Sequence, residues 1–373
     1  MKTRLASLAL LATSVAALSA FSASAEQANG VRPILDKFPV RAPYHAVTDK
    51  MVKARKPAAQ ITQWAGSFTD HHGTKRTFVM IGTDPTNTNT NTVIPFMVVP
   101  VQFTYKAFSG QKFDPKKDTY SDGETVLKNF LKSPLLTTKV DFKSGGVDFG
   151  KSQYVDAFQR ANFYGNNVQN ESNYHVALGS PTVLKPLKIT VESGQGVVEK
   201  NPFGSQNIGT YGFGPMDSQI NSYIQKHSEI TPDQFVFFVS HNIFLTSGGC
   251  CIGGYHYATG TSPGSQTYGY TTLVTEAGSF SQDVSAASHE ISEWMDDPMP
   301  GLNNVGCQDN SWLEVGDPLE GRANYGGFPY TDHGFTYNLQ DEVFIDYFGA
   351  PDTWPVKKLK SFNQLEANYC PGQ

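Results

Sequence analysis

The chain has 373 residues, of which 29 are Lys or Arg and 34 are Asp or Glu, so its formal net charge at neutral pH is −5. This balance gives no reason to expect nucleic acid or an anionic membrane as a partner, because both attract basic surfaces. A chain of this length can form one large domain or two small ones.

The N-terminus has the pattern of a secretory signal peptide. Two basic residues precede an apolar run from 5 to 20, and Ala23-Ser24-Ala25 forms a cleavage site. No later segment reaches the roughly 18 apolar residues that a spanning helix needs. We therefore expect residues 1–25 to be removed from a secreted or periplasmic protein that has no membrane partner. Residues 26–60 are basic and contain prolines, which indicates an extended arm or pro-segment ahead of a single domain from 61 to 373.

Strands and helices follow one another irregularly through this domain. Runs rich in Val, Ile, Phe, Tyr and Thr predict strands at 76–82, 93–106, 187–198, 234–240 and 267–274. The last of these alternates like a half-buried strand. Apolar residues at helical spacing predict helices at 122–133, 153–163 and 216–230, and the polar segment 83–92 is typical of a loop. Because no regular β-α-β order is present, we predict an α+β fold with a mixed sheet.

The sequence SHEISEWMDDP, from 288 to 298, crowds a histidine and four acidic residues into a weakly charged chain. An apolar stripe that includes Val284, Ile291 and Trp294 predicts a helix from about 284 to 296. Asp283 is expected to cap its N-terminus, and Pro298 lies just beyond its end.

The acidic residues of this helix lack a compensating charge. Glu293, Asp296 and Asp297 lie in the last turn, where the helix dipole disfavours each negative charge by about 0.3–1 kcal/mol. No Lys or Arg occurs between 280 and 321. A bound metal ion would compensate this charge, and His289 and Glu293, four residues apart on one helix face, are suited to hold it. The plainer interpretation is an exposed His–Glu pair worth a few tenths of a kcal/mol.

The pattern His-Glu-x-x-Glu differs by one letter from the zincin motif His-Glu-x-x-His. In that motif the residues at i and i+4 bind zinc, and the glutamate between them is the general base. The pattern therefore predicts His289 and Glu293 as metal ligands, Glu290 as the general base, and a zincin-like active-site helix from 284 to 296.

A resemblance to the gluzincin metallopeptidases extends this pattern downstream. In SWLEVGDPLEG, Glu314 follows Glu293 by 21 residues, and Asp317 comes three residues later. The gluzincins have a glutamate ligand and a supporting aspartate after their own motif helix. The resemblance implies Glu314 as a third metal ligand beside His289 and Glu293. It also implies that Asp317 and Asp297 support the ligands.

The chain also resembles the phosphate-induced, EXORDIUM-like extracellular proteins of plants and their bacterial relatives. That family carries S-H-E-x-x-E, then Asn-Pro or Asp-Pro, an E-I-x-D-like segment and a terminal cysteine. The matches here are SHEISEWMDDP, LEVGD and Cys370, with GGYHYA upstream as a vaguer match. The resemblance covers about residues 235–370 and implies a metal site in the half from 235 to 373, without assigning a reaction.

Two further histidines are candidates for this site. His333 is next to Asp332 and downstream of the third ligand, and we consider it as a catalytic residue that donates to the transition state. His256, in GGYHYATG, is a candidate fourth ligand. A lone histidine of this kind is, however, more often a loop residue whose hydrogen bonds are satisfied.

Four cysteines in an exported protein allow three disulfide pairings, and the sequence does not choose among them. We favour Cys307–Cys370, which would tie the C-terminus to the loop after the acidic helix, together with a vicinal Cys250–Cys251 bond in SGGCCIGG. The alternative, a zinc–thiolate cluster, is less favoured because no C-x-x-C spacing is present.

These features predict an exported zinc-dependent hydrolase of the zincin kind, a metallopeptidase with a peptide or protein substrate. The alternative is a non-catalytic extracellular or cell-wall-associated protein with a structural calcium or zinc site. Calcium would take its about six to eight oxygen ligands from a carboxylate set. That set comprises Asp296, Asp297, Asp309, Glu314, Asp317 and Glu320. His289 favours zinc, because calcium does not favour imidazole.

Overall fold

The computed structural model describes residues 60–69, 73–86, 91–137, 140–144, 147–165, 174–262, 264–279, 281–299, 313–319, 328–345, 348, 358–363 and 365–368. The predicted signal peptide and nearly all of the predicted arm lie outside these ranges. None of the helices within them has the length and apolar character that a membrane crossing requires.

The structure confirms the predicted α+β class, with helices and with both parallel and antiparallel strand pairs. The α-helices are α3 Val126–Lys132, α4 Tyr154–Asn162, α5 Phe213–Lys226 and α6 Ser285–Asp296, with short 3-10 turns η2 Lys106–Phe108 and η4 Asp317–Leu319. The strands of the N-terminal half are β1 Gln63–Thr69, β2 Lys75–Ile81, β3 Asn91–Ile94, β4 Phe96–Tyr105, β5 Gln111–Phe113, β6 Val140–Ser144, β7 Val147–Ser152, β8 His175–Leu178, β9 Thr182–Val183 and β10 Leu187–Val191. The remaining strands are β11 Val198–Lys200, β12 Asn207–Gly212, β13 Phe235–His241, β14 Ile243–Thr246, β15 Cys250–Ile252, β16 Gly254–Ala258, β17 Thr267–Leu273, β18 Phe328–Asp332, β19 Phe335–Leu339, β20 Val343–Phe344, β21 Lys358–Ser361 and β22 Glu366–Asn368.

Two predicted strands are each divided in the structure. Pro95 separates β3, which pairs with β8, from β4, which lies in the central sheet. The segment predicted as one strand from 187 to 198 contains β10 and the first residue of β11, with a turn between them at which Gly194 has a φ of +81°. Glycine adopts this left-handed conformation without the steric cost that a Cβ brings.

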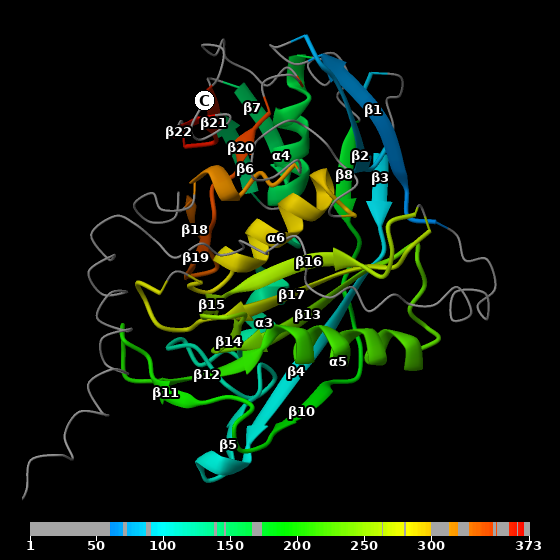
Figure 1. Ribbon diagram of the computed structural model, residues 1–373. Helices are drawn as coiled ribbons and strands as arrows, with labels where there is room; N and C mark the ends of the chain where they lie inside the picture. The colour runs from blue at the N-terminus through cyan, green and yellow to red at the C-terminus, as the bar shows by residue number, and fades with distance from the viewer. Residues whose placement is uncertain are drawn as a thin grey trace, which may run out of the picture.

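The central sheet has the strand order β10-β4-β13-β17-β16. The first four strands are parallel to their neighbours, whereas β16 pairs with β17 in the antiparallel sense. Figure 1 shows α6 on one side of this sheet and α5 on the other. The all-apolar sequence of β13 from Phe235 to Val239 fits this position, because a strand covered on both faces needs no polar side. Strand β17 is also buried at every residue, so the predicted half-buried strand is wrong.

The alternation of side chains along the strands divides the core into two parts. Phe96 and Val98 of β4 pack into the part that contains α6, and Val99 and Val101 pack into the part that contains α5. On β16, Tyr255 belongs to the α5 side. The next side chain, His256, therefore points to the α6 side.

Helix α6 is buried at every residue from Ser285 to Asp296. Its apolar stripe packs on the sheet, where Trp294 stacks on Phe235 with ring centroids 3.8 Å apart. Its other sides meet α4, β2 and β19. The predicted helix is thus present, and burial of its polar face excludes the interpretation of an exposed His–Glu pair.

The predicted N-cap of this helix is wrong. Val284 occupies the cap position, and no side chain caps the helix there. Asp283 instead adopts a left-handed φ of +42° and accepts hydrogen bonds from the backbone N–H of Val284 and of Asn338. Its carboxylate therefore joins the start of α6 to strand β19.

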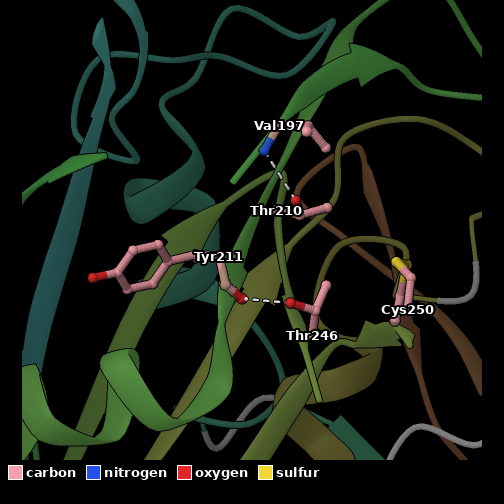
Figure 2. The surroundings of a disulfide bond; sticks show 6 residues. Val197, Thr210, Tyr211, Thr246 and Cys250 are labelled. Carbon is pink, nitrogen blue, oxygen red and sulfur yellow. Dashed lines mark hydrogen bonds between the residues drawn. A yellow bond between two sulfur atoms is a disulfide. The ribbon is translucent and has the colours of Figure 1, made fainter. Parts of the chain in front are cut away.

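A four-stranded sheet, β11-β12-β14-β15, lies beside the central one and carries the vicinal disulfide Cys250–Cys251. Figure 2 shows this disulfide near Thr246, whose hydroxyl donates to the carbonyl oxygen of Tyr211. Cys307 and Cys370 lie outside the described residues, so their predicted pairing stays a prediction.

Candidate metal centre

Helix α6 supplies the first three side chains of the site. His289, Glu290 and Glu293 are all fully buried. Their spacing places His289 and Glu293 one turn apart, and His289 Nε2 lies 3.0 Å from Glu293 Oε2. The structure therefore brings these two predicted ligands together.

Strand β16 supplies a second histidine. From the sequence, this residue was expected to be a loop histidine whose hydrogen bonds are satisfied. His256 Nδ1 lies 3.3 Å from Glu290 Oε2 and 3.7 Å from Glu293 Oε2. Its Nε2–H donates to the backbone carbonyl oxygen of Asp297 at 3.1 Å. Gly254, two residues earlier, permits this approach, because a Cβ there would lie 2.7 Å from Glu290 Cγ. His256 thus lies on a strand and not in a loop, next to the predicted site residues, and both of its ring nitrogens have hydrogen-bond partners.

The segment 313–319 closes the site from another direction. Asp317 Oδ1 lies 3.7 Å from His289 Nε2, whereas Glu314 Oε2 lies 4.0 Å from His256 Nε2. Between them, the N–H of Gly316 donates to Glu293 Oε1 at 3.0 Å. The predicted acidic pair is therefore at the site, but its two members face different histidines.

Glu342 is a further member that the sequence analysis missed. It follows β19, is fully buried, and neither of its carboxylate oxygens has a hydrogen-bond donor among the described residues. A Cβ on Gly316 would lie 2.8 Å from Glu342 Oε2 and 2.4 Å from His289 Nδ1, so both groups converge on the same point. The neighbouring Gln340 fixes this segment, because its backbone N–H donates to the hydroxyl of Ser288 on α6.

Potential ligand atoms gather in two groups within the described part of the chain. One comprises His289, Glu290 and Glu293, and the other comprises His256, Glu293 and Glu314. Within each group the atoms lie within 4.8 Å of one another. The predicted ligands His289, Glu293 and Glu314 are thus divided between two groups that share Glu293.

Burial strongly affects the ionisation of these groups. It raises the pKa of Glu293 well above its ordinary value, and the nearby Asp317 and Glu290 raise it further. Burial likewise raises the pKa of Glu314 and of Glu342 well above the ordinary value. Such carboxyls remain neutral unless a cation compensates their charge, and a divalent metal ion is such a cation.

The electrostatics of His256 agree with a ligand role. Burial, followed by the proximity of His289, lowers the pKa of His256 to about 3. Its imidazole is therefore neutral at physiological pH, which is the form that binds metals. A metal-binding histidine usually donates its other ring N–H to a carbonyl or carboxylate, as His256 does to Asp297.

Asp296 does not join this cluster. Its carboxylate accepts hydrogen bonds from the side-chain amides of Gln159 and Asn162 on α4. Burial raises the pKa of Asp296 to about 8 and that of Asp297 to about 7. Asp296 is therefore not positioned as a member of the predicted calcium ligand set. Two other members of that set, Asp309 and Glu320, lie outside the described residues.

His333 lies apart from this arrangement of contacts. It is exposed, occupies the turn between β18 and β19 with a φ of +43°, and its Nε2 pairs with the hydroxyl of Tyr337 at 2.7 Å. That hydroxyl donates in turn to the carbonyl oxygen of Asn129. These contacts give the predicted catalytic role of His333 no support.

No protein-family model matches the chain, and neither a curated protein nor a solved structure matches it. The resemblances to EXORDIUM-like proteins and to gluzincins accordingly stay predictions that rest on the motifs quoted above.

Proposed function

We propose that the protein is an exported, zinc-dependent hydrolase of the zincin kind that cleaves peptide bonds. The observation that carries this proposal is the convergence of two imidazoles and several carboxylates in a buried site. In that site Glu293, Glu314 and Glu342 have oxygens without a hydrogen-bond donor among the described residues. Buried charged groups persist in proteins when they are paired or bind a metal.

The donor set fits zinc better than calcium. Calcium binds oxygen ligands almost exclusively, whereas zinc binds imidazole nitrogen together with carboxylate oxygen. His289 and Glu293 would hold the ion, with a third ligand from the segment that contains Glu314 and Asp317. Zinc bound there would supply Lewis acidity, which polarises a carbonyl group and lowers the pKa of a water molecule.

The residues of the chain would provide the remaining chemistry. Glu290 follows His289 directly and faces His256, so its carboxylate is placed to accept a proton from the attacking water. The Asp297 carbonyl fixes the ring of His256. The backbone N–H of Gly316 fixes one oxygen of Glu293, and thereby leaves the other for the ion.

A second candidate is a non-catalytic protein in which the same site binds zinc or calcium to stabilise the fold. The complete burial of His289, Glu290 and Glu293 favours it, because structural metal sites are closed whereas catalytic sites keep an open position.

Hydrolysis of an unfolded protein and of a quenched peptide library distinguishes the two candidates. We expect cleavage by the zinc-loaded protein, loss of cleavage with a chelator, and recovery when zinc is restored. Absence of cleavage by fully zinc-loaded protein would favour the structural role.

A further inference from the structure

Glu293 occupies the junction between the two groups of potential ligands. Its Oε2 lies 3.0 Å from His289 Nε2 on one side and 3.7 Å from His256 Nδ1 on the other. The two acids of the 313–319 segment are also divided: Asp317 Oδ1 lies 3.7 Å from His289 Nε2, whereas Glu314 belongs to the ligand group of His256 and Glu293. Each histidine therefore lies near Glu293 and near one acid of the 313–319 segment, and His256 also lies near Glu290.

The tautomer of His256 indicates a cation on its side of Glu293. A carbonyl oxygen only accepts hydrogen bonds, so the contact with Asp297 places the hydrogen on Nε2 and leaves a lone pair on Nδ1. That lone pair faces the carboxyl groups of Glu290 and Glu293, whose Oε2 atoms lie 3.3 Å and 3.7 Å from Nδ1. A metal ion placed between His256 Nδ1 and these carboxyl groups would be coordinated by the ring nitrogen and by carboxylate oxygen.

The site also holds more carboxylates than the ligand set of a single four-coordinate zinc ion uses. Glu293 and Glu314 each have a potential ligand atom within 4.8 Å of the other and of His256, and one oxygen of each lacks a hydrogen-bond donor among the described residues. The ion pairs of these two residues within the described chain have only histidines as partners. Glu342 is buried with no donor for either oxygen in the same part of the chain.

We propose that the site binds two divalent metal ions bridged by Glu293, one held by His289 and Asp317 and the other by His256 and Glu314. The proposal rests on the proposed function only in that both require metal at His289 and Glu293. Glu342, which with His289 Nδ1 lies close to Gly316, is not among the proposed ligands. In two-metal hydrolases the ions lie about 3.5–4 Å apart, a separation that a single bridging carboxylate spans.

Native mass spectrometry of the mature full-length protein, stripped with a chelator and titrated with zinc alone, counts the ions directly. We expect two ions for the parent and one for His256→Gln. His227→Gln is the matched control, because His227 ends α5 and stacks on Tyr223, remote from the α6 side of the sheet. It should bind two ions.

Glu314→Gln provides a second variant in case the substitution of His256 impairs folding, which circular dichroism would show. It should also bind one ion. A count of one for the parent, unchanged in His256→Gln or Glu314→Gln, overturns the second ion and leaves the proposed function standing. A count of zero for the parent overturns both.

Discussion

Glu290 is the residue on which the catalytic proposal depends most. It is fully buried, and its Oε2 lies 3.3 Å from His256 Nδ1. Glu290→Gln preserves the shape of the side chain but removes the base. We expect the metal content to be unchanged and kcat to fall by about 10²–10⁴-fold, the usual contribution of general base catalysis.

Rates on a peptide substrate at saturating zinc provide the measurement for this variant. A Glu290→Gln protein that keeps both its metal and its turnover would contradict the role of Glu290, although the metal site itself would stand.

Gly316 is the residue whose lack of a side chain matters most to the ligands. An alanine Cβ there would lie 2.4 Å from His289 Nδ1, so Gly316→Ala should displace the imidazole. We expect the affinity for zinc to fall by about 10–100-fold, as for other residues that orient metal ligands. Calorimetric zinc titration provides the measurement.

Gly214→Ala is the control for this substitution. Nothing lies within 4 Å of the Cβ that would be added at Gly214, in the first turn of α5. Its affinity for zinc should equal that of the parent. An equal affinity in Gly316→Ala would show that His289 is not held where the structure places it.

At the residue scale, the sequence predicted the ligands that share a helix, because the spacing of four residues places His289 and Glu293 on one face whatever the tertiary fold. It offered His256 only as a less favoured fourth ligand and missed Glu342. Both residues are far from the helix in sequence and reach the site through the tertiary fold. The glycine at 254 and the acidic pair Asp341-Glu342 between apolar strands are the only local signals of their roles.

Among the elements, the start of α6 provides a test of how burial changes stability with pH. Burial raises the pKa of Asp283 from 3.8 to about 7 in the folded protein. A carboxyl whose pKa is higher in the folded than in the unfolded protein contributes its full stability below its unfolded pKa. That contribution is lost as the pH rises through its folded pKa. The free energy of unfolding should therefore fall between about pH 4 and pH 7.

Asp283→Asn removes this titration and keeps a residue type that tolerates left-handed backbone. From about pH 5 to pH 8, the free energy of unfolding of the variant should fall by about 2–3 kcal/mol less than that of the parent. This difference corresponds to about 1.36 kcal/mol per pH unit for one titrating group. Urea unfolding in the presence of a chelator measures the difference, and Asp233→Asn on the partly exposed turn before β13 is the control. The same pH dependence in parent and Asp283→Asn would contradict the account.

The strands show why element prediction succeeded in part. Buried runs such as 234–240 are identified by composition, and β13 forms there. The alternating sequence at 267–274 predicted a half-buried strand. This prediction is wrong because the tyrosines and threonines of β17 are buried on both faces. Tyr268 and Tyr270 satisfy their hydroxyls internally, with Asp217 and with the carbonyl oxygen of Ile243. Periodicity alone does not reveal such internal partners.

For the whole molecule, the predicted bond Cys307–Cys370 would join the segment after α6 to the C-terminus. Peptide mapping of the protein without reductant should recover the two cysteines in one linked pair of peptides. Free thiols at either position would contradict the bond. The vicinal Cys250–Cys251 disulfide should appear as a loss of two hydrogens within a single peptide.

The central claim is that the buried cluster around His289 and Glu293 binds divalent metal. Metal analysis of the protein, by inductively coupled plasma mass spectrometry after purification without chelator, tests it most directly. We predict at least one zinc per chain in the parent and in His227→Ala, and at least one zinc fewer per chain in His289→Ala. A metal-free parent that takes up no zinc, or equal zinc in parent and His289→Ala, would contradict the claim.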